Sequence, residues 1–242
     1  MNEETEAVKE TAKAVQETAK AAQEIAKTTG KVIDVGQRFS SFISRYIFGS
    51  LEQGMGIVED KLKYMRWERQ YRFMEKVEEY MTSIGIEKPT KPIPLKLAIP
   101  LLEAASLEDD DYLQDMWAKL LVNTSIESSP INLNRSYIDI LNCLTHLEAN
   151  ILSVIYALPE DELRNKSILT GNLPDSVDIK DENNKEEPKQ PSKEVTLALA
   201  NLARLGCISL PTTWDGGEIF SNIYPAVMGR SLVEACTLKT KQ

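Results

Sequence analysis

Cys143 and His146 are the first residues to consider for chemistry, because a thiol near an imidazole could form a nucleophile and its base. His146 is the only histidine in the chain, so any such pair must use it. The two residues fall across an expected helix junction, and no set of acidic or cysteine ligands stands near His146. This context is typical of a local structural histidine, and we expect no nucleophilic site here.

Four consecutive acidic residues, 108–111, raise the possibility of a divalent-cation site. Consecutive residues of a helix point in different directions, and no second group of oxygen ligands is apparent in the sequence. Ser106 and Asp109 match a capping box. The acids would then lie at the positive end of a helix dipole. We therefore predict a helix start and no metal site.

Other catalytic motifs are missing from the sequence. It contains no P-loop, GxGxxG, HExxH or GxSxG pattern and no Cys/His metal spacing. We predict a non-enzymatic protein with no catalytic, cofactor-binding or metal-binding residues and no cofactor. Acid–base catalysis by a pair of carboxylates is the one alternative left, because the folded positions of the 37 acidic residues do not follow from the sequence.

Composition points to a cytoplasmic protein. The 242 residues carry a net charge of −9, which makes nucleic acid an unfavourable partner. Cys143, Cys207 and Cys236 are widely spaced and odd in number, as expected of free thiols in a reducing compartment. The N-terminus lacks the pattern of a secretory signal, and no apolar run is long enough to span a membrane.

The N-terminal arm, residues 1–48, is predicted to be amphipathic helix. Residues 4–31 repeat in sevens with a narrow, alanine-rich seam that buries little area. This favours a solvated or loosely packed helix, and the alternative is a partner-binding helix or a weak, self-pairing coiled coil. From residue 32 the apolar stripe widens. Such a stripe suits docking on the protein's own core, a protein partner or a membrane surface. As a candidate partner or membrane contact we select Val32, Val35, Phe39, Phe42, Ile43, Tyr46 and Ile47.

Most of the remaining chain reads as further helices. Residues 57–82 form a locally basic stretch whose interleaved acids favour a salt-bridged, solvated face over nucleic-acid binding. Prolines at 89–94 make a connector, and Pro100 is expected to kink or break a helix over 95–105. A second capping box, Thr145 with Glu148, starts a helix that ends near 158.

The C-terminal part is expected to combine helices with a hairpin. Residues 172–193 read as a flexible polar linker. Beyond them come a helix over 195–205 stopped by Gly206, two short strands around the turn WDGGE and a helix over 226–236. This order is winged-helix-like, but the helix over 195–205 carries too few cations to read DNA. We therefore favour a protein-packing role.

The predicted fold class is mainly α: a multi-helix bundle with a long N-terminal amphipathic helix and a small C-terminal winged-helix-like module with a short β-hairpin. The predicted division of the chain is a helical arm, a helical core domain, a linker and the C-terminal module, over residues 1–48, 49–171, 172–193 and 194–242.

Three stretches of the sequence resemble the abortive infection alpha family. These are EDKLKYMRWERQ, IPLKLAIPLLEAASLEDDDYLQDMWAKLLVN and SYIDILNCLTHLEANIL; the endings NLARLGCI and PAVMGRSLVEAC are similar too. The resemblance covers roughly residues 50–240. It implies an all-helical bacterial protein of phage-defence settings, and it carries no catalytic residues to this chain.

Together these features predict an abortive-infection-type protein that acts through protein contacts or self-association of its N-terminal helices. The alternatives are a membrane-acting effector, peripheral at the inner membrane through residues 32–48, and a DNA-binding regulator that uses the C-terminal module.

Overall fold

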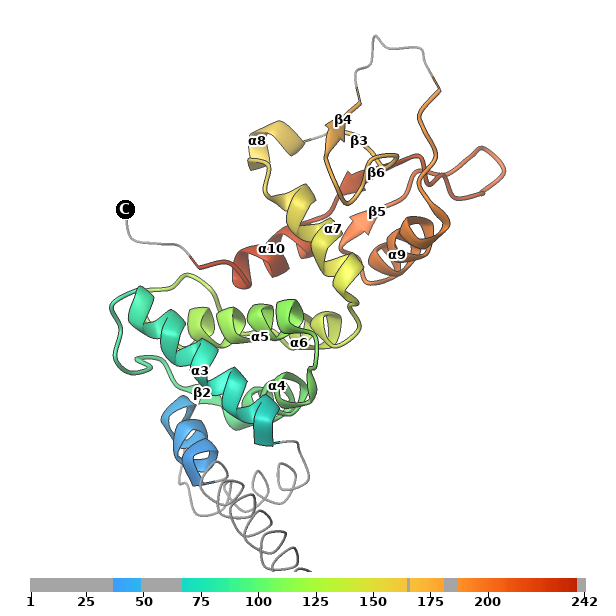
Figure 1. Ribbon diagram of the computed structural model, residues 1–242. Coiled ribbons are helices and arrows are strands. Elements are labelled where there is room, and N and C mark those ends of the chain that lie inside the picture. The colour runs from blue at the N-terminus through green and yellow to red at the C-terminus, as the bar shows by residue number, and fades with distance from the viewer. Residues whose placement is uncertain (1–36, 49–66, 165, 181–186, 239–242) are drawn as a thin grey trace, which may run out of the picture.

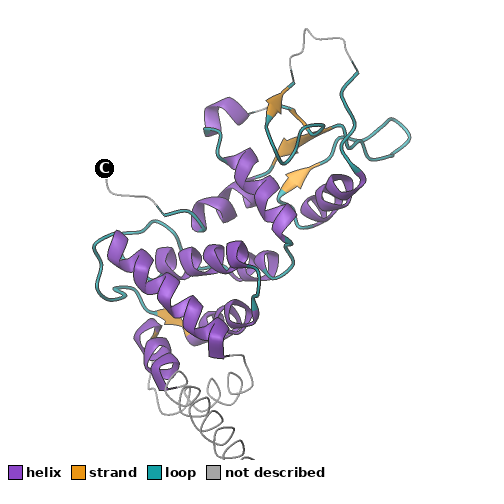
Figure 2. Ribbon diagram, in the orientation of Figure 1, coloured by secondary structure: helices purple, strands orange, loops and turns teal. Residues whose placement is uncertain are grey.

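The computed structural model describes residues 37–48, 67–164, 166–180 and 187–238. Helices dominate, and most strands gather in one small antiparallel sheet beside the later helices (Figures 1 and 2). The mainly α prediction is confirmed at this level. The heptads over residues 4–31 lie outside the described residues, so the long N-terminal helix stays a prediction.

Helices α3 (Trp67–Ser83), α4 (Leu95–Leu107) and α5 (Asp111–Thr124) pack against one another. Each presents apolar side chains at helical spacing, as a core-facing helix should. Phe73, Leu101 and Trp117 from the three helices are fully buried. Of the kink or break expected at Pro100, the break is wrong, because α4 continues through this residue to Leu107.

The capping box predicted at Ser106 and Asp109 is wrong. Ser106 is buried in the last turn of α4, because that helix continues two residues beyond Ala105. The N-cap of α5 is Asp110, whose side chain accepts a hydrogen bond from the Leu113 N–H at 2.9 Å. Aspartate is among the best N-cap residues, and the observed N-cap lies four residues after Ser106, the N-cap expected from the sequence.

Helices α6 (Arg135–Leu141) and α7 (His146–Tyr156) follow. The capping box at α7 is confirmed: Glu148 accepts from the Thr145 N–H at 2.6 Å, and the Glu148 N–H bonds to the Thr145 hydroxyl. Glu148 is buried and also accepts from the Asn201 amide at 2.7 Å. This side chain therefore links the start of α7 to α9.

A four-stranded sheet has the order β4-β3-β6-β5, with all pairs antiparallel. Its strands are β3 (Ile168–Leu169), β4 (Asp178–Ile179), β5 (Ile208–Ser209) and β6 (Asn222–Pro225). The hairpin predicted around WDGGE is confirmed as β5 and β6. The linker prediction is wrong for Asp178 and Ile179, because their backbone pairs with β3.

Helices α8 (Glu160–Leu163), α9 (Lys193–Arg204) and α10 (Val227–Ala235) complete the described chain. Gly206 has φ +71°, as expected of the residue that stops α9. Helix α7 packs on both α9 and α10, and α10 also contacts α5. Figure 1 shows α7 between the sheet and the earlier helices. The winged-helix resemblance of this region stays a prediction.

Candidate functional site

The aromatic stripe selected as a contact surface lies inside the protein. Residues 37–46 are helical, and Phe39, Phe42, Ile43 and Tyr46 are each at most 2% exposed. The Phe42 ring lies 4.9 Å from the Tyr46 ring and 6.1 Å, edge-on, from the Phe73 ring of α3.

The prediction of a partner or membrane contact is therefore wrong for these four side chains, which dock on the protein's own core. Ile47 is half-buried at the start of β1 (Ile47–Phe48), which pairs with β2 (Ile93–Pro94). Val32 and Val35 lie outside the described residues. Within the described residues, no helix is both long and apolar enough to cross a membrane.

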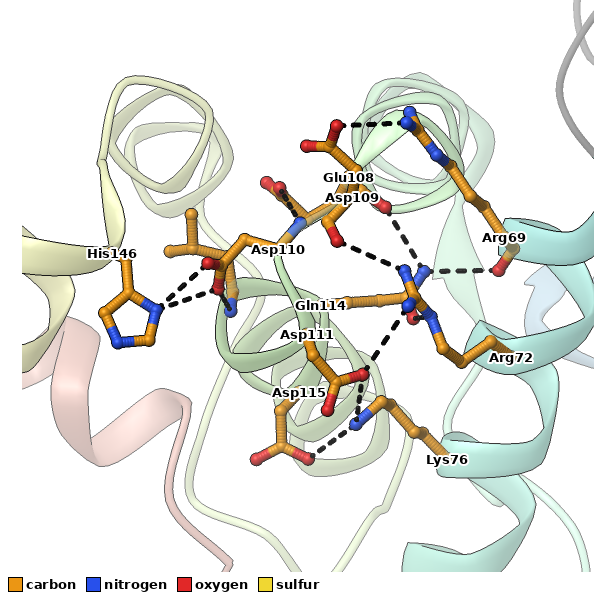
Figure 3. A network of polar contacts seen from close by, with 11 residues as sticks. Arg69, Arg72, Lys76, Glu108, Asp109, Asp110, Asp111, Gln114, Asp115 and His146 are labelled. Carbon is orange, nitrogen blue, oxygen red and sulfur yellow. Dashed lines mark hydrogen bonds and ion pairs between the residues drawn. The ribbon is translucent and has the colours of Figure 1, made fainter.

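The acidic run at the start of α5 binds the basic face of α3 (Figure 3). Asp109 pairs with Arg69 at 3.0 Å. Asp111 lies 3.7 Å from Arg72 and 3.4 Å from Lys76. Each exposed pair contributes at most about 1 kcal/mol, so their main effect is to fix how α3 sits on α5.

Two polar side chains of α5 continue this contact. Asp115 lies 3.5 Å from Lys76 and also accepts from the Tyr80 hydroxyl. Gln114 is fully buried; its Oε1 accepts from the Arg72 guanidinium at 2.6 Å, and its amide donates to the Arg69 carbonyl at 3.2 Å. The salt-bridged prediction is therefore confirmed only in part: the basic residues of α3 pair with acids at the start of α5, whereas the sequence predicted pairs with the interleaved acids of the same helix.

Asp110 faces away from α3 and contacts His146 of α7 (Figure 3). The Nδ1 of His146 lies 3.0 Å from Oδ2 of Asp110, and the imidazole lies 5.2 Å from the Tyr112 ring. The prediction of a local structural role for His146 agrees with this geometry. Cys143 is exposed, and the ring partner of His146 is Asp110 and not Cys143.

The acids at 108–111 therefore serve different neighbours: Asp109 and Asp111 bind α3, and Asp110 binds α7. Among the described residues, no three or more His, Cys, Asp or Glu side chains converge to hold a metal ion. Cys207 and Cys236 are buried free thiols, and burial raises the pKa of Cys207 to about 11. A thiol with so high a pKa is a poor nucleophile at neutral pH.

Replacing Asp110 with alanine gives a pH-dependent loss of stability. Partial burial alone would raise its pKa, but hydrogen bonds from the Leu113 N–H and the His146 ring lower it below the ordinary 3.8. The charged carboxylate therefore stabilises the fold above about pH 4. That contribution fades as the pH falls through the lowered pKa. We expect Asp110→Ala to cost about 1 kcal/mol at pH 7.

Urea unfolding of both proteins between pH 7 and pH 2.5 tests this. The difference between them should shrink below about pH 4. The control is Asp175→Ala, which removes the same charge from an exposed loop. A difference that stays constant down to pH 2.5 would contradict the assignment.

The loop between β5 and β6 displays a tryptophan to solvent. Trp214 is fully exposed. The loop around it is closed by hydrogen bonds from the Thr213 N–H to the Gly217 carbonyl at 2.7 Å and from the Gly217 N–H to the Thr213 hydroxyl at 2.8 Å. Gly216 has φ +87°, which favours glycine. Sequence reasoning identified this turn but passed over the aromatic residue at its tip.

These features define a mainly helical protein in which charged residues join helices and an ordered loop exposes a large aromatic side chain. The family model for abortive infection alpha matches residues 68–236, and the chain belongs to that family. No curated protein and no solved structure matches the chain. The matched range includes the acidic run, His146 and the Trp214 loop.

Proposed function

We propose that this chain is a non-enzymatic phage-defence protein that acts by binding another protein through the Trp214 loop. Membership of the abortive infection alpha family supports the defence role. The exposure of Trp214 supports the protein contact and is the observation that carries the proposal.

Tryptophan has one of the largest apolar side-chain surfaces, about 150–250 Å². Leaving it in water forgoes the stabilisation that burial would give. Hydrogen bonds already order the loop, so a partner that covers the indole pays little to fix the backbone. Tryptophan is also enriched among the residues that dominate protein–protein binding energy.

The surface proposed here differs from the one expected from the sequence, because Phe39, Phe42, Ile43 and Tyr46 are core residues. The seam of residues 4–31 lies outside the described residues, and self-association through it stays a prediction.

Trp214→Ala should abolish protection against phage while leaving the fold intact. The side chain contacts water, so its loss should change the free energy of unfolding by no more than about 0.5 kcal/mol. Loss of a central aromatic anchor typically costs about 2 kcal/mol or more of binding, which exceeds a tenfold change in affinity. Plating efficiency on a bacterial host expressing the variant should match that of a host without the protein.

Leu107→Ala is the matched control, since Leu107 is 56% exposed at the end of α4 and stands outside the loop. A photo-crosslinking residue at 214, compared with one at 107, should capture a specific protein in infected cells. Protection that survives in a folded Trp214→Ala protein would disprove the proposed contact.

A further inference from the structure

A hollow of about 230 Å³ lies where α8, β6 and α10 meet at the end of α7. Its volume is below the range of about 300–1,000 Å³ that is usual for drug-sized ligands. Any occupant is therefore small. The lining is Tyr156, Glu160, Leu163, Arg164, Lys166, Tyr224, Pro225, Ala226, Val227 and Arg230.

The charges around this hollow oppose those of the chain as a whole. Arg164, Lys166 and Arg230 line it together with a single acid, Glu160, whereas the full chain has 28 basic and 37 acidic residues. None of the ion pairs among the described residues involves these three cations. Like charges near one another repel unless an anion lies between them.

Arg230 is held in place at the wall of the hollow. Its guanidinium carbon lies 5.3 Å from the centre of the Tyr156 ring, and its Nη2 lies 3.4 Å from the Leu158 carbonyl. Tyr156 is itself fixed, since its hydroxyl donates to the Cys207 carbonyl at 2.5 Å and accepts from the Ala226 N–H at 2.9 Å. One cation is thus preorganised, which lowers the entropy lost on binding.

Apolar side chains stand uncovered at the rim of the same hollow. Val227 is 84% exposed and Tyr224 is 42% exposed. A purely inorganic ion would leave both in water. Helix α10 also begins here without a side-chain cap on its first turn, so its positive end adds to the field of the three cations.

We infer that this hollow binds a small organic anion whose phosphate or carboxylate head group meets Arg164, Lys166 and Arg230 and whose apolar body covers Tyr224 and Val227. An arginine side chain can bind either a phosphate or a carboxylate through two parallel hydrogen bonds. The site is independent of the proposed protein contact, because Trp214 does not line the hollow.

Amide chemical shifts of the full-length protein, titrated with phenyl phosphate, benzoate and benzyl alcohol, test the inference. The three probes share an aromatic body and differ in the head group. We expect saturable shifts over residues 160–166 and 224–230 with one or both anions and none with benzyl alcohol. The anion that binds more tightly identifies the head group.

The decisive variant is Arg164→Gln with Lys166→Gln. Both side chains are exposed and make no ion pair among the described residues, so the fold should survive. Anion affinity should fall about tenfold or more, as expected for two charge-assisted hydrogen bonds. The control, Lys180→Gln with Lys193→Gln, removes the same charge at exposed positions outside the hollow.

Three results would overturn the inference. The first is that neither anion binds saturably. The second is that both double variants weaken binding equally, which would indicate only long-range attraction. The third is that benzyl alcohol shifts the same amides as strongly as the anions do.

Discussion

Gly229→Ala should destabilise the protein by about 3 kcal/mol or more. Gly229 lies in α10 and is buried against α7. A methyl group there would stand 2.2 Å from the Cys207 carbonyl oxygen and 2.6 Å from the Tyr156 ring and hydroxyl. Neither neighbour can move freely, because the Tyr156 hydroxyl bonds to Cys207 and Ala226. The strain must be taken up by the α7–α10 contact.

Whether Gly229→Ala lowers or raises the free energy of unfolding distinguishes a steric clash at the α7–α10 contact from the higher helix propensity of alanine. In an open helix, replacing glycine with alanine stabilises by up to about 1 kcal/mol. Thermal unfolding should instead show a fall of at least about 6 °C. Gly85→Ala is the control: Gly85 has φ +73° and open space around it, so only backbone strain of about 1–2 kcal/mol applies. An unchanged melting temperature for Gly229→Ala would mean that α10 does not pack as described.

Phe42→Asp is expected to release residues 37–46 from α3 and to destabilise the whole protein. Phe42 is 1% exposed and lies between Phe39, Tyr46 and Phe73. Removing a buried phenylalanine costs about 3–5 kcal/mol, and burying a carboxylate without a partner adds to that loss. Urea unfolding should show a lower midpoint, and proteases should cleave near residue 42 in the native protein.

Ser41→Asp is the matched control, since Ser41 is the neighbouring residue in the same helix and is exposed. It should change stability by no more than about 0.5 kcal/mol. If Phe42→Asp left the free energy of unfolding unchanged, the apolar stripe of residues 37–46 would be exposed and not part of the core. The partner or membrane contact expected from the sequence would then again be the better explanation.

Local signals in the sequence determined much of the helical framework. Thr145 and Glu148 predicted the start of α7, and Gly206 predicted the end of α9, because capping and left-handed turns are decided by neighbouring residues. The turn WDGGE predicted the β5–β6 hairpin for the same reason. The family resemblance, whose model matches residues 68–236, likewise depends on residue order alone.

The start of α5 was predicted wrongly because two residues near it can each cap a helix. Ser106 and Asp110 are both good N-cap residues. The choice between them depends on how far α4 continues, and the core that covers Ala105 and Ser106 decides that. Asp178 and Ile179 look like linker in isolation, because their strand exists only through pairing with β3.

The sequence by itself determined that residues 37–46 form an amphipathic helix, since a 3.6-residue apolar period is a local property. Only the tertiary structure decided what covers that stripe, which is α3 and its Phe73 ring. It also decided that Asp110 meets His146 and that three cations gather near Tyr224. Contacts between residues so far apart in the chain depend on how the helices pack. The spacing of side chains within one helix does not determine which other helix packs against it.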